Sequence, residues 1–170
     1  MKIQTRSELN GGTNIRKLAI AAMLTALSVV IPLLPIPKIV IEPFSATPAS
    51  HLPAILSMFM GPYVCIATSI GAALGFFLGL GSAVIAMRAL SHVIFTTVGC
   101  YMIKKKVNIW LVYVVTMVLH GLAEAIVATV YGSAFSAVWI SVGVFTMIHH
   151  TIDFIISMVV LKALRAAKVM

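Results

Sequence analysis

The stretch from Pro43 to Met87 contains no Lys, Arg, Asp or Glu, and this feature constrains the fold more than any other. The stretch is too long for one membrane-spanning helix, which needs about 20 predominantly apolar residues. The dipeptide Gly61-Pro62 divides it, because Gly and Pro both interrupt regular structure. The stretch therefore predicts two consecutive membrane spans.

The composition of the whole chain also favours a membrane protein. Apolar residues make up 61% of the 170 residues and charged residues only 9%, whereas an ordinary soluble domain carries about 25% charged residues. A soluble fold of this size has too much surface for its volume to bury so many apolar side chains. A soluble enzyme, a disordered chain and a disulfide-stapled secreted domain are thereby excluded. The sequence predicts an all-α integral membrane protein with a single domain, 1–170.

Apolar segments and the breaks between them indicate six transmembrane helices. We expect these at about residues 17–34, 46–60, 62–79, 83–103, 107–130 and 138–161. Pro48 and Pro53 make the second span short and irregular. Three glycines spaced four residues apart give the third span a surface on which another helix can pack closely: Gly71, Gly75 and Gly79. Residues 1–15 are expected to be a loose cytoplasmic tail, and Leu18–Pro37 is long enough to span rather than act as a cleaved signal peptide.

The chain has a net charge of +8, and ten of its twelve basic residues gather in three clusters. The clusters are Lys2, Arg6, Arg16 and Lys17, then Lys104, Lys105 and Lys106, and finally Lys162, Arg165 and Lys168. Cytoplasmic loops of membrane proteins are enriched in Lys and Arg. Both termini and the triple-lysine loop are therefore expected in the cytoplasm, which an even number of spans allows. The positive charge is a topology signal, and no nucleic-acid partner is expected.

Ionisable side chains lie inside the expected spans, although each costs about 2.5–3.5 kcal/mol at a helix centre. They form three pairs with i, i+4 spacing, so that each pair shares one helix face: Arg88 with His92, His120 with Glu124, and His149 with Asp153. A helical rise of about 1.5 Å per residue places most of these groups, and His51, in the outer half of the membrane, with only Asp153 in the inner half. We therefore expect one polar pocket that opens to the outside.

A fixed arginine in such a pocket suits a carboxylate or phosphate, which a planar guanidinium binds through paired hydrogen bonds. We expect Arg88 to hold the ligand, histidines to supply hydrogen bonds, and Glu124 to orient Arg88 or a donor of the ligand. Tyr131, beside the outer loop like Trp139, is either an interfacial residue or a lid over a flat ligand. The candidate binding set is Arg88, His92, His51, His120, Glu124, Tyr131 and His149.

Other roles for these residues stay open at this point. Arg88 and Glu124 could form a structural ion pair, and His120 could serve only to hold Glu124. His149 or the histidine after it could serve only to hold Asp153. The His-x-x-x-acid pairs could bind a transition metal, but Arg88 would repel a cation, so no metal and no other cofactor is expected. The chain lacks a phosphate-binding loop and a nucleophile elbow, which favours a binding subunit energised by a partner over an enzyme.

Several segments of the chain are similar to a known family. Residues 16–27 resemble the first helix of the S components of energy-coupling factor (ECF) vitamin transporters, and Ala22-x-x-x-Ala26 matches their docking motif. More specific stretches look like the niacin-specific S components: Pro48–Pro53, Met58–Pro62, Ala73–Phe77, Arg88–His92 and His149–Phe154. The resemblance covers residues 16–163.

This resemblance implies a multi-pass subunit of a bacterial cell membrane that captures a small carboxylate vitamin, with niacin favoured, from outside. It implies that Ala22 and Ala26 contact a transmembrane coupling (T) subunit and that two ATP-binding cassette ATPases hydrolyse the ATP. In the family picture the S component topples within the bilayer to release its ligand inside. A pantothenate-specific S component and a stand-alone secondary transporter of a small organic acid remain as alternatives.

Overall fold

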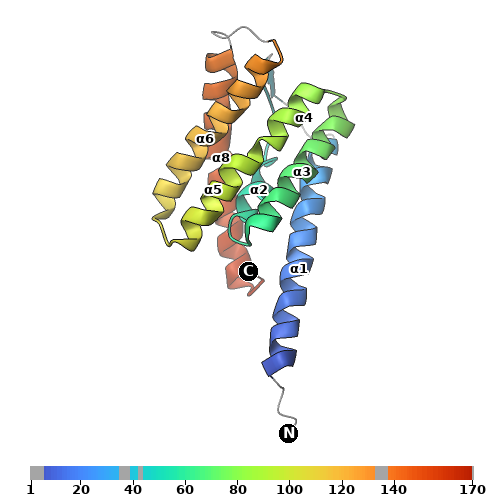
Figure 1. The fold of residues 1–170 in the computed structure, drawn as a ribbon, viewed down its shortest axis with the longest axis vertical. Helices are drawn as coiled ribbons and strands as arrows, with labels where there is room; N and C mark the ends of the chain where they lie inside the picture. The colour runs from blue at the N-terminus through green and yellow to red at the C-terminus, as the bar shows by residue number, and fades with distance from the viewer. Residues whose placement is uncertain (1–5, 35–38, 42–43, 133–137, 170) are drawn as a thin grey trace.

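The structure is a computed structural model, which describes residues 6–34, 39–41, 44–132 and 138–169. Its helices stand side by side as an elongated bundle (Figure 1). Five of them are long and apolar enough to cross a membrane, judged by length and composition within the described residues. The prediction of a helical, multi-pass membrane protein is confirmed, whereas the expected count of six spans is not.

The five long elements follow the apolar segments closely. They are α1 (Arg6–Val30) with the short η1 (Ile31–Leu33), α3 (Pro62–Leu80), α4 (Ala83–Leu90) continued by α5 (His92–Lys104), α6 (Ile109–Val130), and α8 (Phe145–Ala166) preceded by the π-helix η2 (Trp139–Val144). Helix α1 begins at Arg6, so the expected loose tail over 1–15 is wrong from that residue on. Residues 1–5 lie outside the described part of the chain.

The segment expected as the second span, 46–60, has a different structure. Strands β1 (Ile39–Ile41) and β2 (Phe44–Ala46) pair antiparallel, with Ile39 opposite Ala46. A turn follows, and the helix α2 (Leu52–Ser57) has only six residues. Six helical residues rise about 9 Å, far short of a hydrocarbon core of about 30 Å. The expectation of an all-α chain is therefore wrong here, because a small hairpin and a short buried helix replace a regular span.

Helices α1 and α3 meet along three glycines of α3, which we call the glycine seam: Gly71, Gly75 and Gly79. A Cβ atom added at Gly75 would collide with the backbone carbonyl of Val29 on α1. One added at Gly79 would come within 3.0 Å of the carbonyl oxygen of Pro32. The expectation that these small residues allow a close helix approach is confirmed, and α1 is the helix that they admit.

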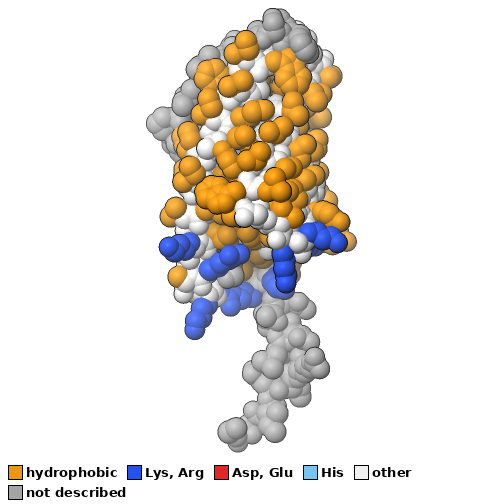
Figure 2. All heavy atoms as spheres, turned by 90° about the vertical axis from the view of Figure 1, so that its left-hand side faces the viewer, with side chains coloured by type: hydrophobic (Ala, Val, Ile, Leu, Met, Phe, Trp, Pro, Cys, Tyr) orange, Lys and Arg blue, Asp and Glu red, His pale blue; other side chains and the backbone are white. Residues whose placement is uncertain are grey.

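Basic side chains collect at one end of the bundle, the end at which both termini lie (Figures 1 and 2). Figure 2 shows them below a broad surface of hydrophobic side chains on the face that it presents. Residues from both ends of the chain line one groove there, among them Arg16, Lys17, Arg165 and Lys168. The three basic clusters are thus consistent with one side of the membrane, and a cytoplasmic location for that side stays a prediction.

Candidate functional site

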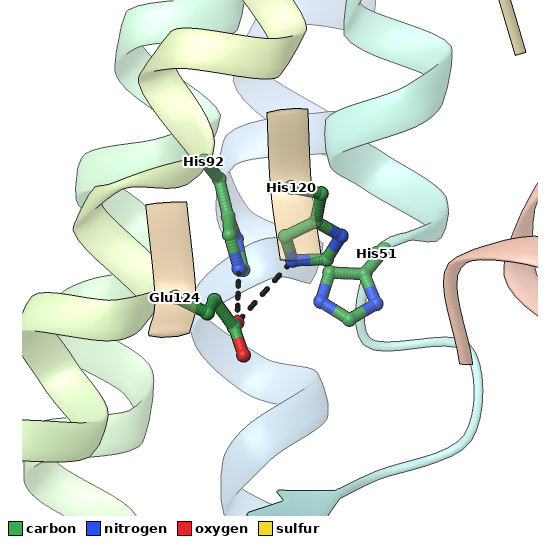
Figure 3. A group of neighbouring side chains, drawn as sticks. All are labelled: His51, His92, His120 and Glu124. Carbon is green, nitrogen blue, oxygen red and sulfur yellow. Dashed lines mark hydrogen bonds and ion pairs between the residues drawn. The ribbon is translucent and has the colours of Figure 1, made fainter. Parts of the chain in front are cut away.

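Glu124 on α6 is the hub of a buried network that joins four elements. Arg88 on α4 donates two hydrogen bonds to Oε2 of Glu124, from Nη2 at 2.6 Å and from Nε at 3.2 Å. The Oγ1 hydroxyl of Thr146 on α8 donates to the same oxygen at 2.9 Å. Nε2 of His92 and Nε2 of His120 each lie 3.2 Å from the other oxygen, Oε1 (Figure 3). Each carboxylate oxygen therefore has its own set of partners.

The local helix geometry brings these groups together. His120 and Glu124 lie one turn apart on α6, as their spacing predicted. Arg88 lies in the last turn of α4 and His92 begins α5, with Ser91 between the two helices. The hydroxyl of Ser91 donates to the Arg88 carbonyl at 2.6 Å and keeps the chain nearly helical through the junction. Both side chains consequently turn to the same side, where Glu124 meets them.

A second carboxylate, Asp153 on α8, holds the turn before α2. Its oxygens accept from the backbone N–H of Ala49 at 2.9 Å and from that of His51 at 3.0 Å. Ala49 has a φ of +62°, a strained value for a residue with a side chain, so these bonds fix a turn that the backbone alone disfavours. The rings of His51 and His149 bond the same carboxylate through Nδ1 at 3.0 Å and Nε2 at 2.9 Å.

The ring of His51 joins the two carboxylate networks. Its centroid lies 4.5 Å from that of His120, 4.6 Å from that of His149 and 4.8 Å from that of His92, with edge-to-face orientation. His150 lies behind His120, with 3.0 Å between their Nδ1 atoms. We call this whole group the polar centre: Arg88, Glu124, Asp153 and all five histidines.

The polar centre is almost completely shielded from solvent. Arg88 is 3% exposed, Glu124 5% and Asp153 1%, and His120 and His150 have no exposed surface. Charges at such depth survive only when they are paired and hydrogen-bonded. Arg88 and Glu124 do form an ion pair, and His149 does bond Asp153, whereas a purely structural role for these contacts stays an alternative. Neither excludes a ligand, because the pair also borders a cavity.

A small cavity opens beside this pair. Its space accessible to water is about 20 Å³, enough for roughly one water molecule. Its walls combine the polar centre with apolar and hydroxyl side chains, and the lining residues are Ala46, Ser50, His51, Phe76, Ile85, Arg88, Ala89, His92, Glu124, Thr146 and His149. Larger grooves lie at the basic end of the bundle, where none of the residues of the polar centre lines them.

The structure brings together most of the residues that the sequence singled out. Arg88, His92, His51, Glu124 and His149 line the cavity. The sixth predicted side chain, that of His120, lies behind the cavity and contacts it through Glu124. The seventh, that of Tyr131, directly follows α6, has 48% of its surface exposed and is absent from the lining of the cavity, so its expected place in the site is not supported.

Two features of the site escaped prediction. Thr146 lies three residues before His149 and seven before Asp153, a spacing that places all three on one face of α8 and could have revealed it. The contact between His51 and Asp153 contradicts the expected difference in depth between them. A helical rise underestimates the depth of His51, because a strand and a turn precede this residue and an extended strand advances about 3.3 Å per residue.

The two alanines expected to contact a partner lie apart from the polar centre. Ala22 and Ala26 are both exposed on α1, one turn apart. Their neighbours on the helix include Met23, which is 64% exposed. Met23 also lines an apolar groove between α1, α2 and α8.

Comparison with known proteins identifies one informative relative. No protein-family model matches the chain, and no solved structure gives a significant match. The niacin transporter NiaX of Lactococcus lactis subsp. cremoris is 36% identical over 130 residues, which cover 72% of this chain and 59% of that protein. The chain thus spans less than two thirds of the length of its curated relative. Given this similarity and five membrane-length helices, the chain is a multi-pass membrane protein of the cell membrane and a homologue of a niacin transporter.

Proposed function

We propose that this chain is the S component, the substrate-binding subunit, of an ECF-type vitamin importer, and that it captures niacin as the pyridine carboxylate. The observation that carries the proposal is Arg88, a buried guanidinium on the wall of a cavity in a membrane protein. An ionisable residue kept at membrane depth marks a functional site by default. The similarity to a niacin transporter supports the same ligand class.

The walls of the cavity suit a flat aromatic acid. A guanidinium carries five N–H donors in one plane, so it can bond a ligand carboxylate in addition to Glu124. Phe76, Ile85 and Ala89 form an apolar wall against which a ring can pack. Ser50 and His149 lie on the polar side, where a neutral imidazole or a hydroxyl can donate to a ring nitrogen. A vitamin is larger than about one water molecule, so binding requires lining side chains to move apart.

Energy for transport would come from partners. The proposal assigns ATP hydrolysis to two ATP-binding cassette subunits and coupling to a T subunit. Ala22 and Ala26 would form the contact with the T subunit, because two small residues one turn apart let a partner helix approach closely in lipid. Their exposure on α1 supports this assignment.

The direct test is ligand binding by the purified chain in detergent. Small molecules that co-purify are identified by mass spectrometry, and calorimetry compares nicotinate, nicotinamide and pantothenate. We expect nicotinate to bind and nicotinamide to bind at least tenfold more weakly, because the neutral amide forfeits a charged hydrogen bond worth about 1.5–3 kcal/mol. Tight binding of pantothenate with no binding of nicotinate would favour the pantothenate-specific alternative, and no binding of any acid would refute the proposal.

Variants of Arg88 locate the ligand. Arg88→Ala and Arg88→Lys should both abolish nicotinate binding or weaken it at least tenfold, and the lysine variant keeps a positive charge at the site. Arg165→Ala, at the basic end of the bundle, is the matched control and should bind normally. Unchanged affinity in a folded Arg88 variant would contradict the clamp.

Uptake by proteoliposomes separates the proposed mechanism from a stand-alone transporter. The chain alone should bind nicotinate without transporting it, and uptake should require the coupling subunit and ATP. Uptake by the chain alone that follows an imposed proton gradient would instead identify a secondary transporter.

A further inference from the structure

We propose that the polar centre holds a divalent transition metal ion of the zinc class, bound by three imidazoles and one carboxylate: His51, His92, His120 and Glu124. The potential ligand atoms of these four residues all lie within 4.8 Å of one another, and all four residues are buried. They come from the turn before α2, from α5 and from α6, so that a metal would tie three elements together (Figure 3). This replaces the expectation from sequence that no metal binds.

The nitrogens already converge as metal ligands do. Nε2 of His92 and Nε2 of His120 each lie 3.2 Å from Oε1 of Glu124. Ligands at about 2.0–2.2 Å from a tetrahedral zinc ion lie about 3.3 Å from one another. A metal could therefore replace the two protons that now point at this one oxygen. His51 would contribute the fourth ligand through Nε2, because its Nδ1 bonds Asp153.

Each of these groups except His92 has a second partner that orients it from behind. Asp153 holds Nδ1 of His51, and Nδ1 of His150 lies 3.0 Å from Nδ1 of His120. Metal-binding histidines characteristically donate their second N–H to such a carboxylate or acceptor, which fixes the tautomer and the ring orientation. Nδ1 of His92 is buried with no hydrogen-bond partner among the described residues.

Arg88 does not stand in the way of the cation. Its guanidinium and the Thr146 hydroxyl both bond Oε2 of Glu124, whereas His92 and His120 face Oε1. The guanidinium and a metal would thus share the carboxylate through opposite oxygens. The objection drawn from sequence, that Arg88 repels a cation, overlooked this division.

Charge balance points the same way. The polar centre contains one arginine and two carboxylates, so with neutral imidazoles its net charge is −1 in a buried, weakly solvated place. A net negative charge attracts a divalent cation, and the cation together with one anionic acid would bring the charge of the buried site from −1 to zero. A site of charge +1 would also accept an anionic acid far better than a site of charge −1. This last consequence rests on the proposed function, whereas the metal site itself does not.

A rival cluster shares one of these residues and gives the control. His51, His149 and Asp153 also place three potential ligand atoms within 4.8 Å of one another. His92 belongs only to the proposed cluster and His149 only to the rival. The same substitution at each position, His92→Asn and His149→Asn, therefore distinguishes the two sites.

The experiment measures metal in the full chain, purified without chelators and without an affinity tag that binds metals. Elemental analysis should find about one zinc ion per chain, and His92→Asn should reduce the content at least tenfold while His149→Asn retains it. The reverse pattern would overturn the proposed ligand set. Absence of metal from the wild type, together with no visible absorption bands on titration of chelated protein with Co²⁺, would overturn the site altogether.

Wild-type protein alone supplies a measurement that does not depend on a variant folding. Stripping with a chelator should lower the thermal unfolding temperature, and Zn²⁺ should restore it while Mg²⁺ does not; equal unfolding temperatures with and without Zn²⁺ would contradict the site. Nicotinate binding is then measured on stripped and reloaded protein. Metal bound without any acid binding would uphold the metal site and refute the proposed function, whereas acid binding by a chain that takes up no metal would do the opposite.

Discussion

The two sides of this bundle are held together by opposite means. In the glycine seam, α1 and α3 meet through backbone and small side chains, with Gly75 directly against the Val29 carbonyl. In the polar centre, α4, α5, α6 and α8 meet through charged and ring side chains around Glu124. Helices in lipid gain little from hydrophobic burial, because lipid tails are as apolar as their side chains. Close packing and buried polar bonds are the remaining ways to join them.

The two regions differ in what they need: the glycine seam is a packing contact, whereas the polar centre contains ionisable side chains. A seam of glycines needs only space, and its stability should not depend on metals or ligands. A polar centre costs desolvation energy that a structural contact would not need, since apolar residues of similar volume often stabilise a protein as well or better. Because five histidines and two carboxylates are kept at this cost, we expect the proposed ligand binding in this region. Substitutions in each region can be compared on one scale, the thermal stability of the isolated chain.

The largest loss is expected when the ion pair of the polar centre is broken on one side. In chelator-treated protein, Arg88→Met leaves Glu124 as a buried carboxylate without its cation, which should cost about 3–5 kcal/mol of unfolding free energy. The double variant Arg88→Met/Glu124→Gln removes both charges and keeps an amide to bond the histidines and Thr146. It should recover most of that loss in denaturant or thermal unfolding of detergent-solubilised protein. A double variant no more stable than Arg88→Met would show that the charge of Glu124 is not what the arginine balances.

A smaller loss is expected in the glycine seam. Gly75→Ala places a methyl group against the backbone of Val29, which cannot swing aside like a side chain, and overpacking of this kind costs about 1–3 kcal/mol. Gly143→Ala is the control, because its added Cβ would meet nothing closer than 3.8 Å. Unfolding measured with and without Zn²⁺ sharpens the comparison, since the Gly75→Ala loss should be equal in both. Equal stability of the two alanine variants would contradict a tight α1–α3 contact.

Much of this fold could be predicted from the sequence because hydrocarbon thickness dictates helix length. The apolar runs predicted the five long helices nearly to their ends, except at the start of α1, and i, i+4 spacing identified Arg88, His92, His120 and Glu124. The prediction of a membrane span over residues 46–60 was wrong, because apolar residues without a charge fit a span, a strand or a short buried helix equally well. Local spacing also could not show that Asp153 reaches back about 100 residues to the turn at Ala49, a contact set by the packing of α8.

The sequence predicted which residues belong to the site better than it predicted how those residues are arranged. Spacing along one helix shows which side chains share a face, but not which oxygen of Glu124 each partner bonds. That division between Oε1 and Oε2 decides whether a cation fits beside Arg88, and only the three-dimensional structure reveals it. Tyr131 does not line the cavity, and its other expected role, that of an aromatic residue at the membrane interface, stays a prediction.

The smallest effect on stability, with the sharpest effect on assembly, is expected on the free face of α1. Ala22 and Ala26 are exposed on the helix whose other face forms the glycine seam. Ala22→Trp should change unfolding free energy by no more than about 0.5 kcal/mol, as surface substitutions do, and should leave nicotinate binding intact. It should nevertheless block co-purification with the coupling subunit and the ATPases, because an indole fills the groove that two alanines leave for a partner helix. Ile140→Trp, at a position on η2 that is 69% exposed, is the control and should assemble normally. Normal assembly of Ala22→Trp would contradict the docking role of α1 and place the partner on another face of the bundle.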